Sequence, residues 1–448
     1  MTPAARLAAT IDILGELARN DAPTRDVLAG YFRRRRYAGS RDRAAIRDRV
    51  YAIVRDLARL QWHLAAAGGD PALPRHWVLA GCALAGDPVA GLFAGDGYGP
   101  AALDAAEAAL AAALAAADDS DAAVPEAARL GCPAWLEPAL RASLGSGFAA
   151  ELRALNEPAP VDLRVNAART DREAMRRALA AAGIAAAATP HAPCGLRLDG
   201  HPELQNLAMY RDGLIEPQDE GSQMLALAVG AVPGDRIVDY CAGAGGKTLA
   251  LAAAKAGQGG ARGAAGAGAA GSGDRGRIVA CDVSAARLRR MAPRLARAGA
   301  AALVEFHDLS AGDGAPLPPG TADRVLVDAP CSATGTWRRH PFQRWRLDPA
   351  ALAALVGLQR DILDAAAALV RPGGRLVYAT CSLLDAENRD RAAAFAAAHP
   401  DFVRLPADQS LPALLRSDMV TSQGELRLTP ARHGTDGVFA ALFERKAA

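Results

Sequence analysis

A glycine-rich turn after a short apolar run is the feature that most restricts the fold of this chain. The turn, Cys241–Thr248, separates the run Arg236–Tyr240 from a helical stretch. Strands that alternate with helices in this way indicate a parallel sheet covered on both faces. We therefore expect an α/β fold from Gly221 onward. Four further short Val/Leu/Ile-bearing runs support the same alternation, at Arg277–Cys281, Leu303–Phe306, Arg324–Asp328 and Arg375–Ala379.

Three known motifs compete for the turn. A Walker A loop fails by one residue, because its first glycine would fall on Cys241. The dinucleotide fingerprint G-x-G-x-x-G fails because its last glycine would fall on Thr248. The pattern acid-x-x-x-G-x-G fits Asp239, Gly243 and Gly245, and it is the usual opening of a Rossmann-like domain that binds S-adenosylmethionine. A plain strand–helix turn is the alternative without a ligand.

An acidic residue that holds ribose hydroxyls is expected at the end of the second strand, about 20 residues further on. Asp282 ends that strand but follows Asp239 by 43 residues. The intervening segment Ala256–Gly276 has 21 residues, nearly all Gly, Ala and Ser, and we interpret it as a flexible surface insertion. Without it the spacing is 22 residues, as the motif requires. Asp308, beyond the third strand, could accept from an adenine amino group or cap a helix.

Two cysteines follow the fourth and fifth strands. Cys331 comes directly after Asp328-Ala329-Pro330, and Cys381 comes directly after Thr380. A single cysteine is more often a packing residue than a reactive one. Ligands of open α/β sheets bind at the carboxyl ends of strands, however, so both thiols should face one crevice. Methylation at carbon 5 of a cytosine needs such a thiol, because its addition to carbon 6 makes carbon 5 nucleophilic, while an acid near the ring nitrogen stabilises the adduct.

These motifs resemble those of the Nop/Sun family of RNA cytosine-5 methyltransferases, in particular its bacterial 16S rRNA methyltransferase B-like branch. The resemblance runs from Leu152 to the C-terminus and includes Gln218–Gln223, Arg338–Trp345 and Thr435–Phe439. It implies that Cys381 is the nucleophile, that Cys331 assists release of the methylated RNA, and that Asp328 contacts the cytosine and borders the cofactor. It further implies that Asp282 holds the ribose of S-adenosylmethionine and that Asp308 holds its adenine. The loop of the protein that binds this cofactor would consist of Cys241, Ala242, Gly243, Ala244, Gly245, Gly246 and Lys247.

The sequence departs from the family pattern at two places. Gly243-Ala244 stands where Ala-Pro is usual, and Phe342 stands where an acid is common. Around Phe342, tryptophans alternate with arginines. Either the tryptophans stack on an unpaired base while the arginines hold phosphates, or the tryptophans are core residues flanked by solvated arginines. We also expect Glu387 and Asn388 to cap the helix that follows them. The alternating set is Trp337, Arg338, Arg339, Arg344, Trp345 and Arg346.

The expected domains are a helical RNA-binding domain at 1–145, a small RNA-recognition-like α/β segment at 146–220, and a methyltransferase domain at 221–448 with the insertion 256–276. The helical domain resembles antitermination factors. Residues 1–60 carry 13 Arg and 7 acidic side chains, although the whole chain has a net charge of only +2. Its most basic part, Arg33–Tyr37, is either a solvated helix end or a phosphate-contacting patch.

We expect an enzyme that transfers a methyl group from S-adenosylmethionine to a cytosine of RNA, with ribosomal RNA favoured and transfer RNA second. A non-catalytic RNA-binding assembly factor and a nucleoside triphosphatase are the rival interpretations. Seven cysteines without a C-x-x-C pair predict neither disulfides nor a metal site. Without an apolar segment of signal-peptide or membrane length, we expect a cytoplasmic protein away from the membrane. We also expect a monomer.

Overall fold

The computed structural model divides the chain into two compact units. The first is formed by Met1–Pro158 with Thr336–Pro349, and the second by Ala159–Gly335 with Ala350–Ala448. The finer division into three domains remains a prediction. Of the expected insertion, residues 258–275 lie outside the described residues. The structure describes residues 1–120, 122–257, 276–312, 314–411 and 414–447.

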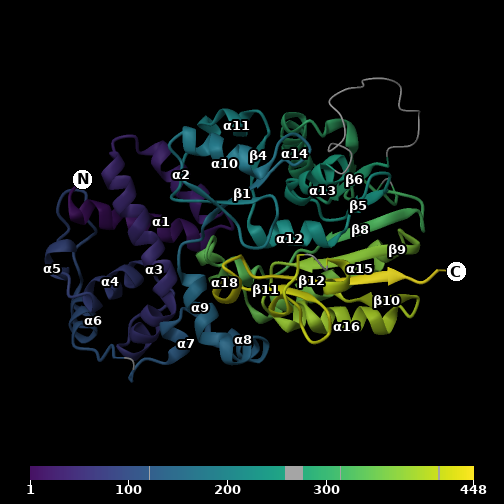
Figure 1. The fold of residues 1–448 in the computed structure, drawn as a ribbon. Helices are drawn as coiled ribbons and strands as arrows, with labels where there is room; N and C mark the ends of the chain where they lie inside the picture. The colour runs from purple at the N-terminus through teal and green to yellow at the C-terminus, as the bar shows by residue number, and fades with distance from the viewer. Residues whose placement is uncertain (121, 258–275, 313, 412–413, 448) are drawn as a thin grey trace. The chain divides into compact units, whose positions relative to one another are not determined.

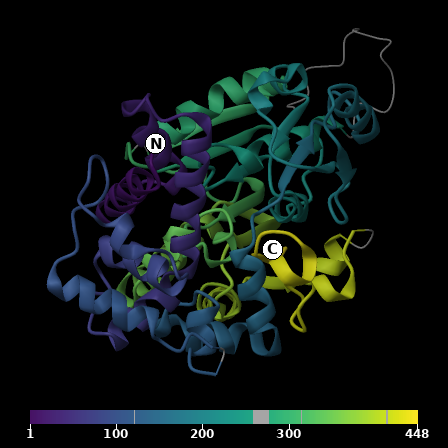
Figure 2. The same ribbon diagram turned by 90° about the vertical axis from the view of Figure 1, so that its left-hand side faces the viewer.

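The first unit is helical, as its apolar spacing predicts (Figure 2). Leu7, Leu14 and Leu17 recur at helical spacing along α1 and are almost fully buried. Thr2 caps this helix, because its side chain accepts a hydrogen bond from the backbone N–H of Ala5. The helices are α1 (Pro3–Arg19), α2 (Thr24–Arg34), α3 (Ser40–Ala66), α4 (Pro74–Leu84), α5 (Val89–Leu92), α6 (Ala105–Ala115), α7 (Glu126–Arg129), α8 (Glu137–Leu144) and α9 (Phe148–Asn156).

The segment 336–349 belongs to this helical unit although it lies late in the chain. Phe342, on η6 (Pro341–Trp345), packs in the same apolar cluster as the helices. The indole N–H of Trp345 donates to the carbonyl of Val54 at 2.9 Å. Arg344 is fully buried and donates to Gly131 O at 2.9 Å. The structure therefore supports the interpretation that Trp345 and Arg344 are packed inside the helical unit, and not the one in which they bind RNA.

A small antiparallel sheet opens the second unit. Val161–Val165 forms a strand as expected, and the expected helix follows it as Arg172–Ala181. Leu163 and Val165 of the strand pack with Met175 and Leu179 of the helix. The sheet order is β2-β3-β1-β4, with β1 (Val161–Val165), β2 (Ala186–Ala188), β3 (Gly195–Leu198), β4 (Ile215–Pro217) and the helices α10 (Arg172–Ala181) and α11 (Ala208–Arg211).

A larger sheet forms the rest of the second unit, in the order β10-β12-β9-β8-β5-β6-β7, with β11 paired to β12. Strands β5 to β9 are parallel, which confirms the expected α/β class. The C-terminal strands are antiparallel and were not expected. The strands are β5 (Ile237–Asp239), β6 (Ile278–Asp282), β7 (Val304–Asp308), β8 (Ala322–Asp328), β9 (Val370–Thr380), β10 (Phe402–Leu405), β11 (Leu426–Leu428) and β12 (Val438–Arg445).

Helices cover both faces of this sheet (Figure 1). Met224, Leu249 and Met291 bring α12, α13 and α14 into the apolar cluster on one face. Leu363 and Phe395 bring α15 and α16 into the cluster on the other. The helices are α12 (Glu220–Ala228), α13 (Gly246–Gly257), α14 (Ala285–Ala298), α15 (Pro349–Ala367) and α16 (Arg389–Ala398), with short α17 (Ala407–Ser410) and α18 (Pro430–His433).

The strand order places a topological switch point between β5 and β8. The chain runs outward from β5 through β6 to β7 and then returns to form β8 on the other side of β5. Open α/β sheets bind their ligands in the crevice outside the carboxyl ends of the strands at such a point. Asp239 ends β5 and Asp328 ends β8. We therefore expect a ligand to bind at the loops that follow these two acids.

Across the described ranges, none of the helices has the length and apolar character that a membrane span needs. Over the same ranges, no three His, Cys, Asp or Glu side chains are grouped in a way that could hold a metal ion.

Candidate active site

The glycine-rich turn after β5 is held open by its backbone hydrogen bonds. Ala242 N–H donates to Cys281 O at 2.8 Å, and Gly243 N–H donates to a carboxylate oxygen of Asp282 at 2.9 Å. Gly243 has a φ of +57°, and a Cβ built on it would meet nothing within 4 Å. The turn therefore leaves space beside Gly243 that a ligand can approach closely, as the cofactor loop of the expected domain requires.

Gly245 fills a different need, because its φ is +86° and a Cβ there would overlap the Met291 side chain of α14. We expect Gly245→Ala to lower the free energy of unfolding by about 1–3 kcal/mol through backbone strain alone, with a further loss from the displaced Met291. Chemical denaturation measures this. The matched control is Gly243→Ala, which shares the left-handed backbone but has open space and should cost less. Equal losses for the two variants would contradict the packing argument.

Asp282 and Asp308 end the neighbouring parallel strands β6 and β7 and lie opposite each other in register. Asp282 is nearly buried, and its second oxygen accepts from Ser284 N–H at 2.8 Å. Asp308 accepts from the hydroxyl and the N–H of Ser310, and these hydrogen bonds lower the pKa of its carboxyl. Both acids therefore lie at the carboxyl edge of the sheet, where the sequence places them. Their contacts with ribose and adenine remain predictions.

Asp239 is fully buried beneath the turn and accepts a hydrogen bond from the Thr248 hydroxyl at 2.7 Å. Its other oxygen, Oδ1, has no hydrogen-bond partner in the described structure. Burial raises the pKa of Asp239 to about 7, although the Thr248 hydrogen bond opposes this shift. This carboxyl therefore changes charge near neutral pH.

This pKa predicts a pH-dependent stability. The folded-state value of about 7 exceeds the unfolded value of about 3.9, so the folded protein keeps a proton that the unfolded chain releases in this interval. The stabilisation is present below about pH 4 and is lost as the pH rises through 7. When the pH rises from 4 to 8, the change in the free energy of unfolding should be more negative in the wild type than in Asp239→Asn, by on the order of 4 kcal/mol. Denaturant titrations across this range check it, and parallel curves would contradict it.

The two cysteines after β8 and β9 lie side by side. The sulfurs of Cys331 and Cys381 are 3.4 Å apart, and both residues are partly exposed. The hydrogen bond to Cys381 and burial raise the pKa of the Cys331 thiol well above its ordinary value, with a further contribution from the charge of Glu387. Cys331 therefore stays protonated near neutral pH and can donate its S–H to Cys381. The predicted meeting of the two thiols at one edge of the sheet is confirmed.

Lys247, in the first turn of α13, contacts the acid at the end of β8. Its Nζ lies 2.6 Å from a carboxylate oxygen of Asp328. Burial lowers the pKa of Lys247, but Asp328 and, less strongly, Cys381 outweigh it, so the pKa is raised overall. The cation is thus held at the carboxyl end of β8.

Asn388 occupies the N-cap position of α16, but the expected capping hydrogen bond from a side chain is not made there. Instead, Asn388 binds the loop that carries Cys381. It accepts from the Thr380 hydroxyl at 2.5 Å and donates to Ser382 O at 2.8 Å. Sequence reasoning missed this role.

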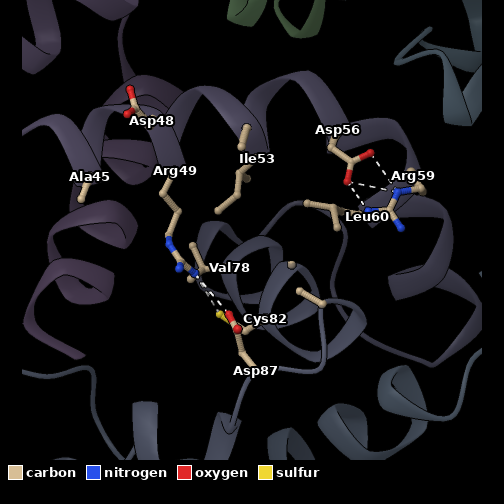
Figure 3. Close-up of a pocket in the computed structure, with 13 residues that line it drawn as sticks. Ala45, Asp48, Arg49, Ile53, Asp56, Arg59, Leu60, Val78, Cys82 and Asp87 are labelled. Atoms are coloured by element: carbon tan, nitrogen blue, oxygen red, sulfur yellow. Dashed lines mark hydrogen bonds and ion pairs between the residues drawn. The ribbon is translucent and has the colours of Figure 1, made fainter. Parts of the chain in front are cut away.

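A separate hollow of about 480 Å³ lies in the first unit, along α3 and α4 (Figure 3). Arg49 and Asp87 approach to 3.5 Å in it, and Arg59 donates to Asp56 at 2.9 Å. Burial raises the pKa of the Cys82 thiol to about 11, so this thiol is not ionised at neutral pH. These charged groups pair with one another, Asp48 pairs with Arg47 beside the hollow, and we assign no function to it.

The parallel sheet, the open glycine turn after β5 and the acids that end β5, β6 and β7 define a Rossmann-like domain of the S-adenosylmethionine-dependent methyltransferase class. A finer assignment comes from known proteins. The family model of 16S rRNA methyltransferases RsmB/F matches residues 226–444, and a ferredoxin-like domain of RsmF/B-like methyltransferases matches 132–205. The chain belongs to this family, which confirms the resemblance found in its motifs.

Individual relatives agree. The probable ribosomal RNA small subunit methyltransferase B of Synechocystis is 33% identical over 70% of this chain and 66% of its own length. The ribosomal RNA small subunit methyltransferase B of Vibrio cholerae is 31% identical over 73% and 68%. The match thus spans about two thirds of these relatives. The solved structure of PH0851 superposes with a TM-score of 0.75 at 24% identity over 99% of both chains, which supports the fold.

Proposed function

We propose that this protein transfers a methyl group from S-adenosylmethionine to carbon 5 of a cytosine in 16S ribosomal RNA. The observation that carries the proposal is the 3.4 Å separation of the Cys331 and Cys381 sulfurs at the ends of neighbouring strands. Cytosine-5 methylation through a covalent adduct needs a nucleophilic thiol and a second group that helps to resolve the adduct. The family supports ribosomal RNA as the substrate class.

In the proposed mechanism, Cys381 attacks carbon 6 of the cytosine. Lys247 holds a proton beside Asp328, and this pair can stabilise the charge that develops on the ring nitrogen. Cys331 remains a protonated thiol, so it donates its S–H to the Cys381 sulfur as that sulfur leaves carbon 6, while water takes the proton that carbon 5 loses. The target cytosine must be unpaired or flipped out, because a thiol cannot reach carbon 6 within a stacked helix.

S-adenosylmethionine, when bound, supplies the methyl group. The open space at Gly243 and the carboxylate of Asp282 fit such a ligand, because the turn has no side chain there and Asp282 fixes its backbone. We propose that the loop Cys241–Lys247 holds the cofactor, with Asp282 at the ribose, Asp308 at the adenine and Asp328 at its border. The protein would act as a monomer in the cytoplasm, where ribosomal RNA is found.

Bisulfite mapping of cellular RNA with and without the gene tests the function. We expect one cytosine of 16S ribosomal RNA to lose its protection when the gene is deleted, and to regain it when the wild-type gene returns. Loss of protection in a transfer RNA would move the substrate to that class. If no cytosine changed in any RNA while the protein still bound RNA, the non-catalytic assembly factor would be the better interpretation.

A further inference from the structure

Behind the two thiols lies a buried carboxylate that the mechanism above does not use. Glu387, on η7 (Asp385–Glu387), has no exposed surface. Its Oε1 accepts from Ser332 N–H at 2.8 Å and from Gln359 Nε2 at 3.0 Å. Its Oε2 accepts from the hydroxyls of Ser332 and Ser382. A carboxylate offers about four acceptor sites, so these four donors occupy it fully.

The two hydroxyls give this carboxylate a particular geometry. Ser332 directly follows Cys331, and Ser382 directly follows Cys381. Both hydroxyls donate to the same oxygen of Glu387, and the two serine oxygens lie 3.1 Å apart. Glu387 thus joins the loop after β8 to the loop after β9 at the residues adjacent to the thiols. The separation of the sulfurs follows from where these two backbones are held.

The four donors also distinguish a carboxylate from an amide at this position. An amide has one acceptor oxygen and one NH₂ group, so it cannot accept from donors on both sides. In Glu387→Gln, the NH₂ group must face either the two serine hydroxyls or the Ser332 N–H and Gln359. With the NH₂ group toward the Ser332 N–H and Gln359, donors meet donors, at a cost of about 1–3 kcal/mol. With the NH₂ group toward the serines, both hydroxyls must turn and accept from it, and each O–H then needs a new acceptor in place of the carboxylate. We expect the loops to move.

We propose that Glu387 is a positioning residue that sets the separation of the Cys331 and Cys381 sulfurs by holding the serine after each of them. The expected effect of Glu387 on catalysis rests on the proposed function. Its effect on the separation of the two sulfurs can be tested independently of that function. The negative charge of Glu387 also contributes to the raised pKa of Cys331. Loss of that charge should therefore lower the pH at which Cys331 ionises.

The test compares Glu387→Gln with Glu425→Gln. Glu425 is also buried in the second unit, where it binds Arg404 at 3.0 Å, and it has no hydrogen bond to either serine. For Glu387→Gln we expect kcat to fall roughly 100-fold, because small misplacements of reacting groups have effects of this size. The KM for RNA should stay within about twofold, and the pH profile should shift to lower pH. Glu425→Gln should retain the wild-type kcat and pH profile.

A chemical measurement reports the thiol separation directly. Phenylarsine oxide reacts with two adjacent thiols to form two As–S bonds and release one water, and mass spectrometry follows this bridging. We expect bridging between Cys331 and Cys381 to be fast in the wild type and in Glu425→Gln, and at least tenfold slower in Glu387→Gln. Bridging and kcat at wild-type values in Glu387→Gln would overturn the proposal.

Two further variants decide the matter if Glu387→Gln does not fold. Ser332→Ala and Ser382→Ala each remove one hydroxyl and leave the carboxylate with its other donors. Each should slow bridging partly, and the double variant should slow it more than either. Wild-type bridging in the double variant would overturn the proposal. A wild-type protein that bridges phenylarsine oxide but methylates no RNA would instead overturn the proposed function alone.

Discussion

Replacing Cys381 with alanine is expected to abolish methyl transfer, with a loss on the order of 10⁴-fold or more, as for the removal of a nucleophile from other enzymes. Without this sulfur, nothing adds to carbon 6 and carbon 5 of the cytosine stays unreactive. Cys331, 3.4 Å away in the wild type, is a poor substitute, because burial and the charge of Glu387 still raise the pKa of its thiol after the hydrogen bond to Cys381 is lost. Single-turnover incorporation of labelled methyl from S-adenosylmethionine into 16S ribosomal RNA measures the effect.

The control for this variant is Cys194→Ala, which removes a partly buried thiol from the small α/β segment. It should retain the wild-type rate. Equilibrium binding of S-adenosylmethionine shows that Cys381→Ala is folded. Full turnover by a folded Cys381→Ala protein would refute the assignment of the nucleophile, and with it the covalent mechanism.

Replacing Cys331 with alanine is expected to give a different result, a protein that remains joined to its RNA. The S–H of Cys331 lies beside the sulfur of Cys381, so its loss removes the group placed to assist as the adduct breaks down. We expect one methyl group per protein to be transferred and multiple turnover to fall at least 100-fold, in line with the usual contribution of general acid–base groups. A denaturing gel should show a slowly migrating protein–RNA band.

The double variant that lacks both thiols supplies the control, since it has no nucleophile to form the adduct. It should show no band. If Cys331→Ala gave no band either, while transferring methyl groups at the wild-type rate, Cys331 would have no part in release. The residue would then be a neighbour of the nucleophile without a role in the reaction.

Much of this site could be predicted from the sequence because it depends on strand ends. Short apolar runs located β5, β6 and β8 to within a few residues, and parallel strands bring their carboxyl ends to one edge. The positions of Cys331 and Cys381 directly after two such runs were therefore enough to bring the thiols together. The spacing of Asp239 and Asp282 became informative once the segment between them was interpreted as an insertion, and that interpretation stays a prediction.

Other features could not be found in this way. Strand β12 (Val438–Arg445) is buried on both faces, so it lacks the alternation that reveals a strand. The role of Glu387 depends on Ser332, which lies 55 residues away, whereas its position just before α16 favours a helix cap. The Trp and Arg residues of 336–349 have the composition of an RNA-binding segment, and only their tertiary partners show that Trp337 and Arg344 are buried.

The return of the chain to the helical unit at 336–349 bears on how such a protein can evolve. Phe342 and Trp345 complete the apolar cluster of helices that are encoded more than 200 residues earlier. A deletion of residues 1–158 would leave these aromatic side chains without their packing partners and expose them to aggregation. The helical part is therefore not a module that a single recombination event could remove or exchange, and its two separate stretches of gene must be inherited together.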